Sequence, residues 1–248
     1  MSARAAAALL AALAAAPAPA PAADQGYPLQ AVEISIHNHA ALQRGAKYFV
    51  NYCLSCHSSR YARYQWVGED LGLSEELVRE NLILTGGKIG DLMTVAMPED
   101  KALEWFGAPA PDLTLVARSR GVDWLYTYLK AFYLDESRPM GVNNAIFQHV
   151  AMPHVLWELQ GWQQPVYKEN GGANGDRRVI AGFELVKPGL LSEEEYDEVV
   201  RDLVTFLAYL AEPAALKREK SGIWVILFLL LLLGVTYFLK REYWKDIH

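Results

Sequence analysis

Cys53-Leu54-Ser55-Cys56-His57 is the stretch on which the organisation of this chain depends. Its C-x-x-C-H spacing is typical of a c-type haem attachment site. Two thiols on one short turn add across the two vinyl groups of a haem, and the adjacent histidine then offers an imidazole nitrogen to the iron. The chain has no second C-x-x-C-H and no other cysteine. We therefore predict one haem c, attached through Cys53 and Cys56 and ligated by His57.

Two other kinds of site use the same cysteine spacing. A structural zinc site normally needs four nitrogen or sulfur ligands, and the chain has only two cysteines. A redox-active dithiol does not require the histidine that follows the second cysteine. The export signal at the start of the chain favours covalent haem over both alternatives.

Residues 1–23 read as a secretory signal rather than as part of the fold. One basic residue, Arg4, precedes an Ala/Leu run over 5–16, and a Pro/Ala tract follows to Ala23. Alternation of proline with alanine blocks a helix beyond Ala16. Export would place the haem in the periplasm of a bacterium.

The opposite end of the chain contains an uncharged, almost wholly apolar run over residues 222–239. Its length suits one helix across the hydrocarbon core, and Trp224 and Tyr237 near its ends suit the membrane interfaces. A buried core helix is the alternative, but no face of the run is polar. We predict an anchor over 217–239, a cytoplasmic tail over 240–248, and a single pass through the bacterial inner membrane in contact with lipid.

Residues 24–216 form one domain by length, and their charge is acidic. The whole chain carries 29 Asp and Glu against 23 Lys and Arg, a net charge of −6, and basic residues gather beside the apolar run. This sign disfavours nucleic acid as a partner. The acidic charge of the domain is explained either by simple solubility or by a docking surface for a basic partner.

The domain reads as mainly helical. The closing helix has the clearest signals, because Ser192 and Glu195 form a capping box and Pro213 stops it. Gly45, inside the first helix, suggests close approach of another helix. The expected elements are a helix from Asn38 to about Cys53, one from Ser74 to about Leu84, one from Asp123 to about Leu134, a strand-like run over Val179–Val186, and the closing helix from Ser192.

The sixth iron ligand stays open at this level. Met97 and Met152 occur in the same tetrapeptide, Val-Ala-Met-Pro, and a proline beside a ligand methionine stiffens its loop. His149 and His154 flank Met152 and could give bis-histidine ligation. Methionine and histidine together would suit electron transfer, whereas an open position would allow gas binding or peroxide chemistry. A methionine of the ordinary core is the remaining alternative for either candidate.

Taken in order along the chain, these motifs resemble the cytochrome c1 family. The resemblance covers nearly all of the chain after the signal. It is carried by Arg44-Gly45, Tyr52 to Ser58, Tyr61 to Gly68, Ala110-Pro111-Asp112-Leu113-Thr114, Arg118-Ser119-Arg120, Val150 to Pro153, Glu212-Pro213 and the single C-terminal anchor.

The resemblance implies roles that spacing alone does not give. It implies a mainly α, single-haem c-type cytochrome domain with irregular insertions and one C-terminal transmembrane helix. It selects Met152 over Met97 as the axial ligand and places Pro111 against the porphyrin. It also implies that Arg120 pairs with a haem propionate, for which a guanidinium fork is well suited.

The same resemblance implies a function and partners. The chain would be a subunit of ubiquinol–cytochrome c reductase, the bc1 complex, with quinol oxidation occurring elsewhere in the complex. It would take electrons from the Rieske iron–sulfur protein and pass them to a soluble or membrane-tethered c-type cytochrome. Cytochrome b and a dimeric assembly are implied too. A stand-alone anchored shuttle and a haem-based sensor remain as alternatives.

Overall fold

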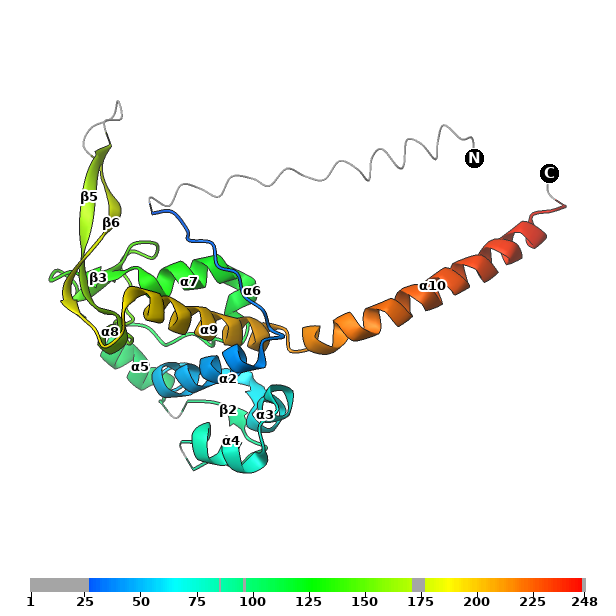
Figure 1. The fold of residues 1–248 in the computed structure, drawn as a ribbon, viewed down its shortest axis with the longest axis horizontal. Coiled ribbons are helices and arrows are strands. Elements are labelled where there is room, and N and C mark those ends of the chain that lie inside the picture. Colours follow the sequence, from blue (N-terminus) through cyan, green and yellow to red (C-terminus); the bar gives the residue numbers. More distant parts are fainter. Residues whose placement is uncertain (1–26, 85, 96, 171–176, 247–248) are drawn as a thin grey trace.

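Helices dominate the chain, as the sequence predicts (Figure 1). The computed structural model describes residues 27–84, 86–95, 97–170 and 177–246, so the expected export signal over 1–23 lies outside the described residues. The helices are α2 (His39–Tyr48), the π-helical turn η1 (Phe49–Cys53), α3 (Tyr64–Leu71), α4 (Glu75–Asn81), α5 (Glu99–Phe106), α6 (Val116–Arg120), α7 (Val122–Lys130), α8 (Trp157–Gln160), α9 (Glu193–Ala211) and α10 (Ala215–Tyr243).

The first and last helices of the domain, α2 and α9, pack directly against each other (Figure 1). Asn38 caps α2 by accepting a 3.2 Å hydrogen bond from the Ala41 backbone N–H, and the predicted capping box starts α9. At the crossing, Gly45 faces the backbone of Asp202, where a β-carbon would lie 2.2 Å from the carbonyl oxygen. The expected close approach at Gly45 is therefore confirmed.

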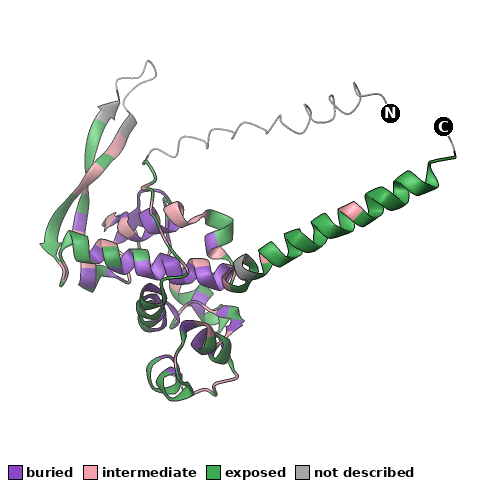
Figure 2. Cartoon of the chain, turned by 45° about the vertical axis from the view of Figure 1, so that its right-hand side comes forward, coloured by how far each residue is buried: buried purple, intermediate pink, exposed green. Residues whose placement is uncertain are grey.

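The main core lies along α9, whose inner face is buried for most of its length (Figure 2). Leu203 and Phe206 are fully buried, and Phe206 packs on Phe49 of η1 with ring centroids 5.5 Å apart. Burial of such side chains removes apolar area from water and supplies most of the driving force for packing. The apolar residues on the inner face of α9 are all buried: Val199, Val200, Leu203, Phe206, Leu207 and Leu210.

The described residues also contain three antiparallel strand pairs. They join β1 (Ser59–Arg63) to β2 (Leu92–Met93), β3 (Phe132–Leu134) to β4 (Val142–Asn144), and β5 (Gly161–Asn170) to β6 (Arg177–Pro188). The last pair is a long twisted hairpin that projects away from the helices (Figure 1). Its base packs against β3, and Trp162 of β5 and Met152 pack against the same small buried cluster.

Several expected boundaries are wrong. The helix expected to reach about Leu134 ends at Lys130, and residues 132–134 instead form β3. The helix from Ser74 ends at Asn81 rather than near Leu84. The strand-like run over Val179–Val186 belongs to a 12-residue strand with a long partner, β5. For β3 and β6, pairing with another strand overrides the local pattern from which the boundary was predicted.

The last helix, α10, leaves the domain and extends away from it (Figure 1). Within the described residues it is the one helix long and apolar enough to cross a membrane, over Ser221–Tyr243, and none of that segment is buried in the chain (Figure 2). The alternative of a buried core helix is therefore excluded. The apolar surface of α10 is suited to lipid or to another membrane helix.

Candidate functional site

The C-x-x-C-H turn begins at Cys53, the last residue of η1. The N–H of Leu54 bonds to the carbonyl of Phe49 at 3.0 Å, which closes the last wide turn of the helix. The N–H groups of Cys56 and His57 then bond to the carbonyl of Cys53 at 3.1 and 2.8 Å. These bonds fold the motif into one compact turn, with Cys53 and His57 buried and Cys56 half-buried.

A cavity of about 620 Å³ lies beside this turn. Its walls are predominantly apolar and come from segments far apart in the sequence, including the 106–113 link, α6, α7 and the loop after β4. The site residues predicted from the sequence all line it, namely Cys53, Cys56, His57, Pro111, Arg120 and Met152. The fold therefore brings all of them to one place, in a shape and chemistry that suit a porphyrin.

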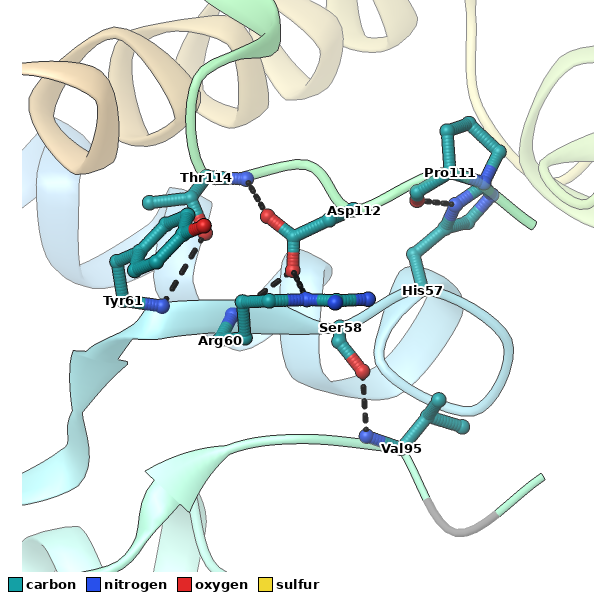
Figure 3. A network of polar contacts seen from close by, with 8 residues as sticks. All are labelled: His57, Ser58, Arg60, Tyr61, Val95, Pro111, Asp112 and Thr114. Atoms are coloured by element: carbon teal, nitrogen blue, oxygen red, sulfur yellow. Dashed lines mark hydrogen bonds and ion pairs between the residues drawn. The ribbon is translucent and has the colours of Figure 1, made fainter. Parts of the chain in front are cut away.

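His57 is oriented for ligation by a single hydrogen bond. Its Nδ1 lies 2.7 Å from the carbonyl oxygen of Pro111, which can only accept a hydrogen bond, so Nδ1 carries the proton (Figure 3). The lone pair of the imidazole is then on Nε2. Burial lowers the pKa of His57, although the Pro111 bond and Asp112 oppose that shift. The ring is thus held neutral, as an iron ligand must be.

Asp112 ties the 106–113 link to β1, the strand that follows the C-x-x-C-H turn (Figure 3). Its carboxylate accepts from the backbone N–H of Arg60 at 2.9 Å, from the Arg60 guanidinium at 3.2 Å, and from the Thr114 N–H at 2.9 Å. The N–H of Leu113 also bonds to the Ser58 carbonyl at 2.8 Å. These contacts fix the position of the Pro111 carbonyl relative to His57.

Of the four methionines after the signal, Met97 and Met152 line the cavity. The Met152 sulfur accepts a 3.4 Å hydrogen bond from the Tyr128 hydroxyl of α7. Among the residues described, neither His149 nor His154 is part of the cavity wall. The His154 ring is buried and stacks on Phe132, with centroids 5.1 Å apart and planes 6° apart. The geometry therefore disfavours bis-histidine ligation.

Arg120 lies at the cavity beside two aromatic rings. Its guanidinium carbon is 5.0 Å from the Trp124 ring centroid and 5.9 Å from that of Phe147, which are cation–π distances. The neighbouring Arg118 does not line the cavity and pairs instead with Glu212 at 3.0 Å. The two arginines of α6 therefore have different environments, and Arg120 is the one available to an anionic group in the cavity.

The two alternative uses of the cysteines fit poorly. Burial raises the pKa of the Cys53 thiol to about 12, whereas a redox dithiol needs a thiol that ionises easily. In the part of the chain that the structure describes, no three His, Cys, Asp or Glu residues are grouped as a metal ion would need. The donor set matches the thioether and imidazole chemistry of a haem c and not that of a zinc site.

Comparison with known proteins identifies the family. The model of the Cytochrome C1 family matches residues 31–163 and 191–247, which is most of the chain. The chain belongs to the cytochrome c1 family. Between the two matched segments, residues 164–190 are unmatched, and they fall almost wholly in the β5–β6 hairpin.

Individual relatives are similar to this chain over most of its length. The cytochrome c1 of Allochromatium vinosum is 52% identical over 90% of this chain and 91% of its own length. A protein of Nitrosomonas europaea named ammonia monooxygenase gamma subunit is 48% identical over 97% of both chains. The cytochrome b/c1 of Bradyrhizobium diazoefficiens is 25% identical over 85% of this chain but only 34% of its own length.

As a member of the cytochrome c1 family, the chain uses covalently bound haem c and is an electron-transport component of the bc1 complex. Sequence reasoning identified six of the residues that line the cavity but missed two supports, the Asp112 contacts and Tyr128. A signal for the second exists, because Trp124 and Tyr128 are four residues apart and therefore share one face of α7. No local sequence pattern predicts the hydrogen bond between His57 and the Pro111 carbonyl.

Proposed function

We propose that this chain passes electrons one at a time from the Rieske iron–sulfur protein, through its haem c, to a soluble or membrane-tethered c-type cytochrome. The observation that carries the proposal is the arrangement of His57 and Met152 in one apolar cavity. Methionine–histidine ligation raises the potential of a haem and suits electron transfer. The haem, once bound, supplies the electron-carrying chemistry, and the side chains supply attachment, orientation and exclusion of water.

In this proposal a single haem is attached to Cys53 and Cys56, and His57 and Met152 are its axial ligands. Support for His57 is its Nδ1 contact with Pro111, which leaves Nε2 free for iron. Support for Met152 is its place in the cavity wall and the definite position that Tyr128 gives to its sulfur. Met97 also lines the cavity and is the alternative ligand.

Arg120 and Pro111 serve the edges of the haem. Arg120 would pair with a propionate, because its guanidinium stands at the cavity and its neighbours there are aromatic rather than acidic. Pro111 would contact the porphyrin with its ring while its carbonyl holds His57. Neither residue transfers a proton, and quinol oxidation takes place elsewhere in the complex.

The membrane arrangement follows from α10. We infer that the haem domain lies in the periplasm, that α10 crosses the inner membrane once, and that the residues after it face the cytoplasm. The relative named cytochrome b/c1 supports a close association with cytochrome b, because its name joins the two subunits and this chain covers 34% of it. We also propose that the complex that contains this chain assembles as a dimer.

One experiment separates this function from a stand-alone shuttle. The full chain, tagged after His248, is purified from membranes in mild detergent and assayed for inhibitor-sensitive quinol–cytochrome c reduction. We expect a b-type cytochrome and an iron–sulfur protein to co-purify with that activity. An untagged strain is the control. A redox-active haem protein that carries neither partner under several detergents would overturn the proposal in favour of the shuttle.

A haem-based sensor and an oxygen-using enzyme both need an open position on the iron. The name of the Nitrosomonas europaea relative, an ammonia monooxygenase subunit, makes this alternative worth testing. Ligation by Met152 leaves no open position, so the reduced protein should not bind carbon monoxide readily at neutral pH. Rapid binding would favour the sensor or the enzyme.

A further inference from the structure

Tyr128 makes a contact that the electron-transfer proposal does not itself require. Its hydroxyl donates to the Met152 sulfur over 3.4 Å, across the gap between α7 and the loop after β4. A buried tyrosine hydroxyl usually has a hydrogen-bond partner, but a thioether sulfur is only a weak acceptor. The choice of Met152 as the partner of Tyr128 therefore calls for an explanation. Both residues line the cavity, so the bond lies where the axial ligand would meet the haem.

The Tyr128 ring is held by its neighbours rather than by the methionine. It stacks on Trp124, with centroids 4.9 Å apart and planes 11° apart, and it meets Phe132 edge-on at 5.1 Å. Its backbone carbonyl accepts a 2.8 Å hydrogen bond from the Asn144 side chain, which ties α7 to β4. The hydroxyl therefore has a fixed direction, set before any ligand bond forms.

We propose that Tyr128 is a positioning residue for the axial ligand: its hydroxyl engages one lone pair of the Met152 sulfur and directs the other toward the iron. This inference rests on the proposed ligation by Met152. A thioether sulfur has two lone pairs, so one hydrogen bond and one bond to iron satisfy it. The same hydrogen bond selects one of the two orientations of the methionine methyl group.

The hydrogen bond also affects the potential. It withdraws electron density from the sulfur, and oxidised iron needs that density more than reduced iron does. Tyr128 therefore favours the reduced haem and raises the midpoint potential. A net hydrogen-bond contribution of the usual size, if it acts on the reduced state alone, corresponds to about a fivefold change in the ratio of reduced to oxidised protein.

Tyr128→Phe tests the proposal, because it keeps the ring and its stacking and removes only the hydroxyl. The full chain is purified in detergent with its haem, and its midpoint potential and the methyl resonance of the axial methionine are recorded. We expect about a fivefold fall in the reduced-to-oxidised ratio at the wild-type midpoint. We also expect the methyl resonance to report two orientations instead of one.

Tyr126→Phe is the matched control. Tyr126 lies on the same helix, is buried, and has its hydroxyl 3.5 Å from the Lys130 ammonium rather than in the cavity wall. An unchanged potential in Tyr128→Phe, or an equal shift in both tyrosine variants, would overturn the positioning role. Met152→Leu separates failure of the Tyr128 proposal from failure of the proposed ligation by Met152. If that variant keeps the methionine–iron charge-transfer band, Met152 is not the ligand and the proposed ligation itself fails.

Discussion

The backbone of Gly45 in α2 lies against the carbonyl of Asp202 in α9, so closely that a β-carbon at position 45 would stand 2.2 Å from that oxygen and 2.7 Å from the β-carbon of Phe206. Both obstacles belong to rigid parts of α9 rather than to the end of a flexible side chain. The two helices that frame the haem-binding turn therefore depend on glycine at this position.

Gly45→Ala should destabilise the domain, because α2 and α9 must separate to admit one methyl group. Overpacking of this kind costs about 1–3 kcal/mol in the free energy of unfolding. Denaturant unfolding of the haem-loaded protein measures the loss. Gly90→Ala is the control, since a β-carbon there meets nothing within 4 Å. Equal stability of the two variants would show that the crossing is not tightly packed.

Arg44→Met should also destabilise the crossing. Asp202 is 5% exposed and accepts from the Arg44 guanidinium at 2.5 and 3.1 Å. Removing the cation leaves a buried carboxylate unpaired, but water reaches the half-exposed arginine and screens the pair, so we expect a loss of about 1–3 kcal/mol. Adding Asp202→Asn should recover part of that loss in the same unfolding measurement. Strictly additive losses would contradict the pairing.

Asp112→Asn should loosen the link that carries Pro111. Burial alone would raise the pKa of Asp112, but hydrogen bonds from Thr114 and Arg60 outweigh it and lower that pKa. Because the folded pKa lies below the unfolded value of about 3.9, ionised Asp112 stabilises the fold above that pH. This contribution is lost as the pH falls through the lower, folded pKa.

The stability difference between wild type and Asp112→Asn should therefore be largest near neutral pH and shrink as the pH falls below about 4. Unfolding by denaturant at a series of pH values measures it. A difference that stays constant down to the lowest accessible pH would mean that the Asp112 charge contributes nothing, and that only the shape of the side chain matters.

Arg120→Gln should lower the midpoint potential of the haem. An unpaired propionate charge favours oxidised iron, and an ion-pair loss of about 1 kcal/mol corresponds to about 40 mV for a one-electron couple. Redox titration measures the shift. Arg118→Gln is the matched control, because Arg118 lies in the same short helix, is 61% exposed and pairs with Glu212. A shift in Arg118→Gln as large as that in Arg120→Gln would remove the special role of Arg120.

Features that depend on short stretches could be predicted from the sequence. The helix cap at Asn38, the capping box at Ser192 and the close approach at Gly45 are each signalled by residue type and spacing, and the structure confirms them. The apolar run that forms α10 can likewise be recognised from one continuous stretch of sequence. Such features express backbone chemistry that changes little with context.

Features that depend on pairing across the chain could not be predicted. The strand β3 follows directly after α7 because residues 132–134 pair with 142–144, a partner that no helical pattern reveals. The roles of the Pro111 carbonyl and of Asp112 arise from contacts across more than fifty residues. Residue spacing does not decide between Met97 and Met152 for a similar reason, because each methionine reaches the cavity from a different part of the fold.

Carbon monoxide binding by the reduced protein at neutral pH tests the central claim, ligation by His57 and Met152, most directly. Wild type, Met152→Leu and Met97→Leu are purified as full chains and compared at equal content of covalent haem. We predict rapid binding by Met152→Leu alone, because only that variant opens a position on the iron. Rapid binding by Met97→Leu, with none by Met152→Leu, would contradict the claim and assign the ligand to the earlier methionine.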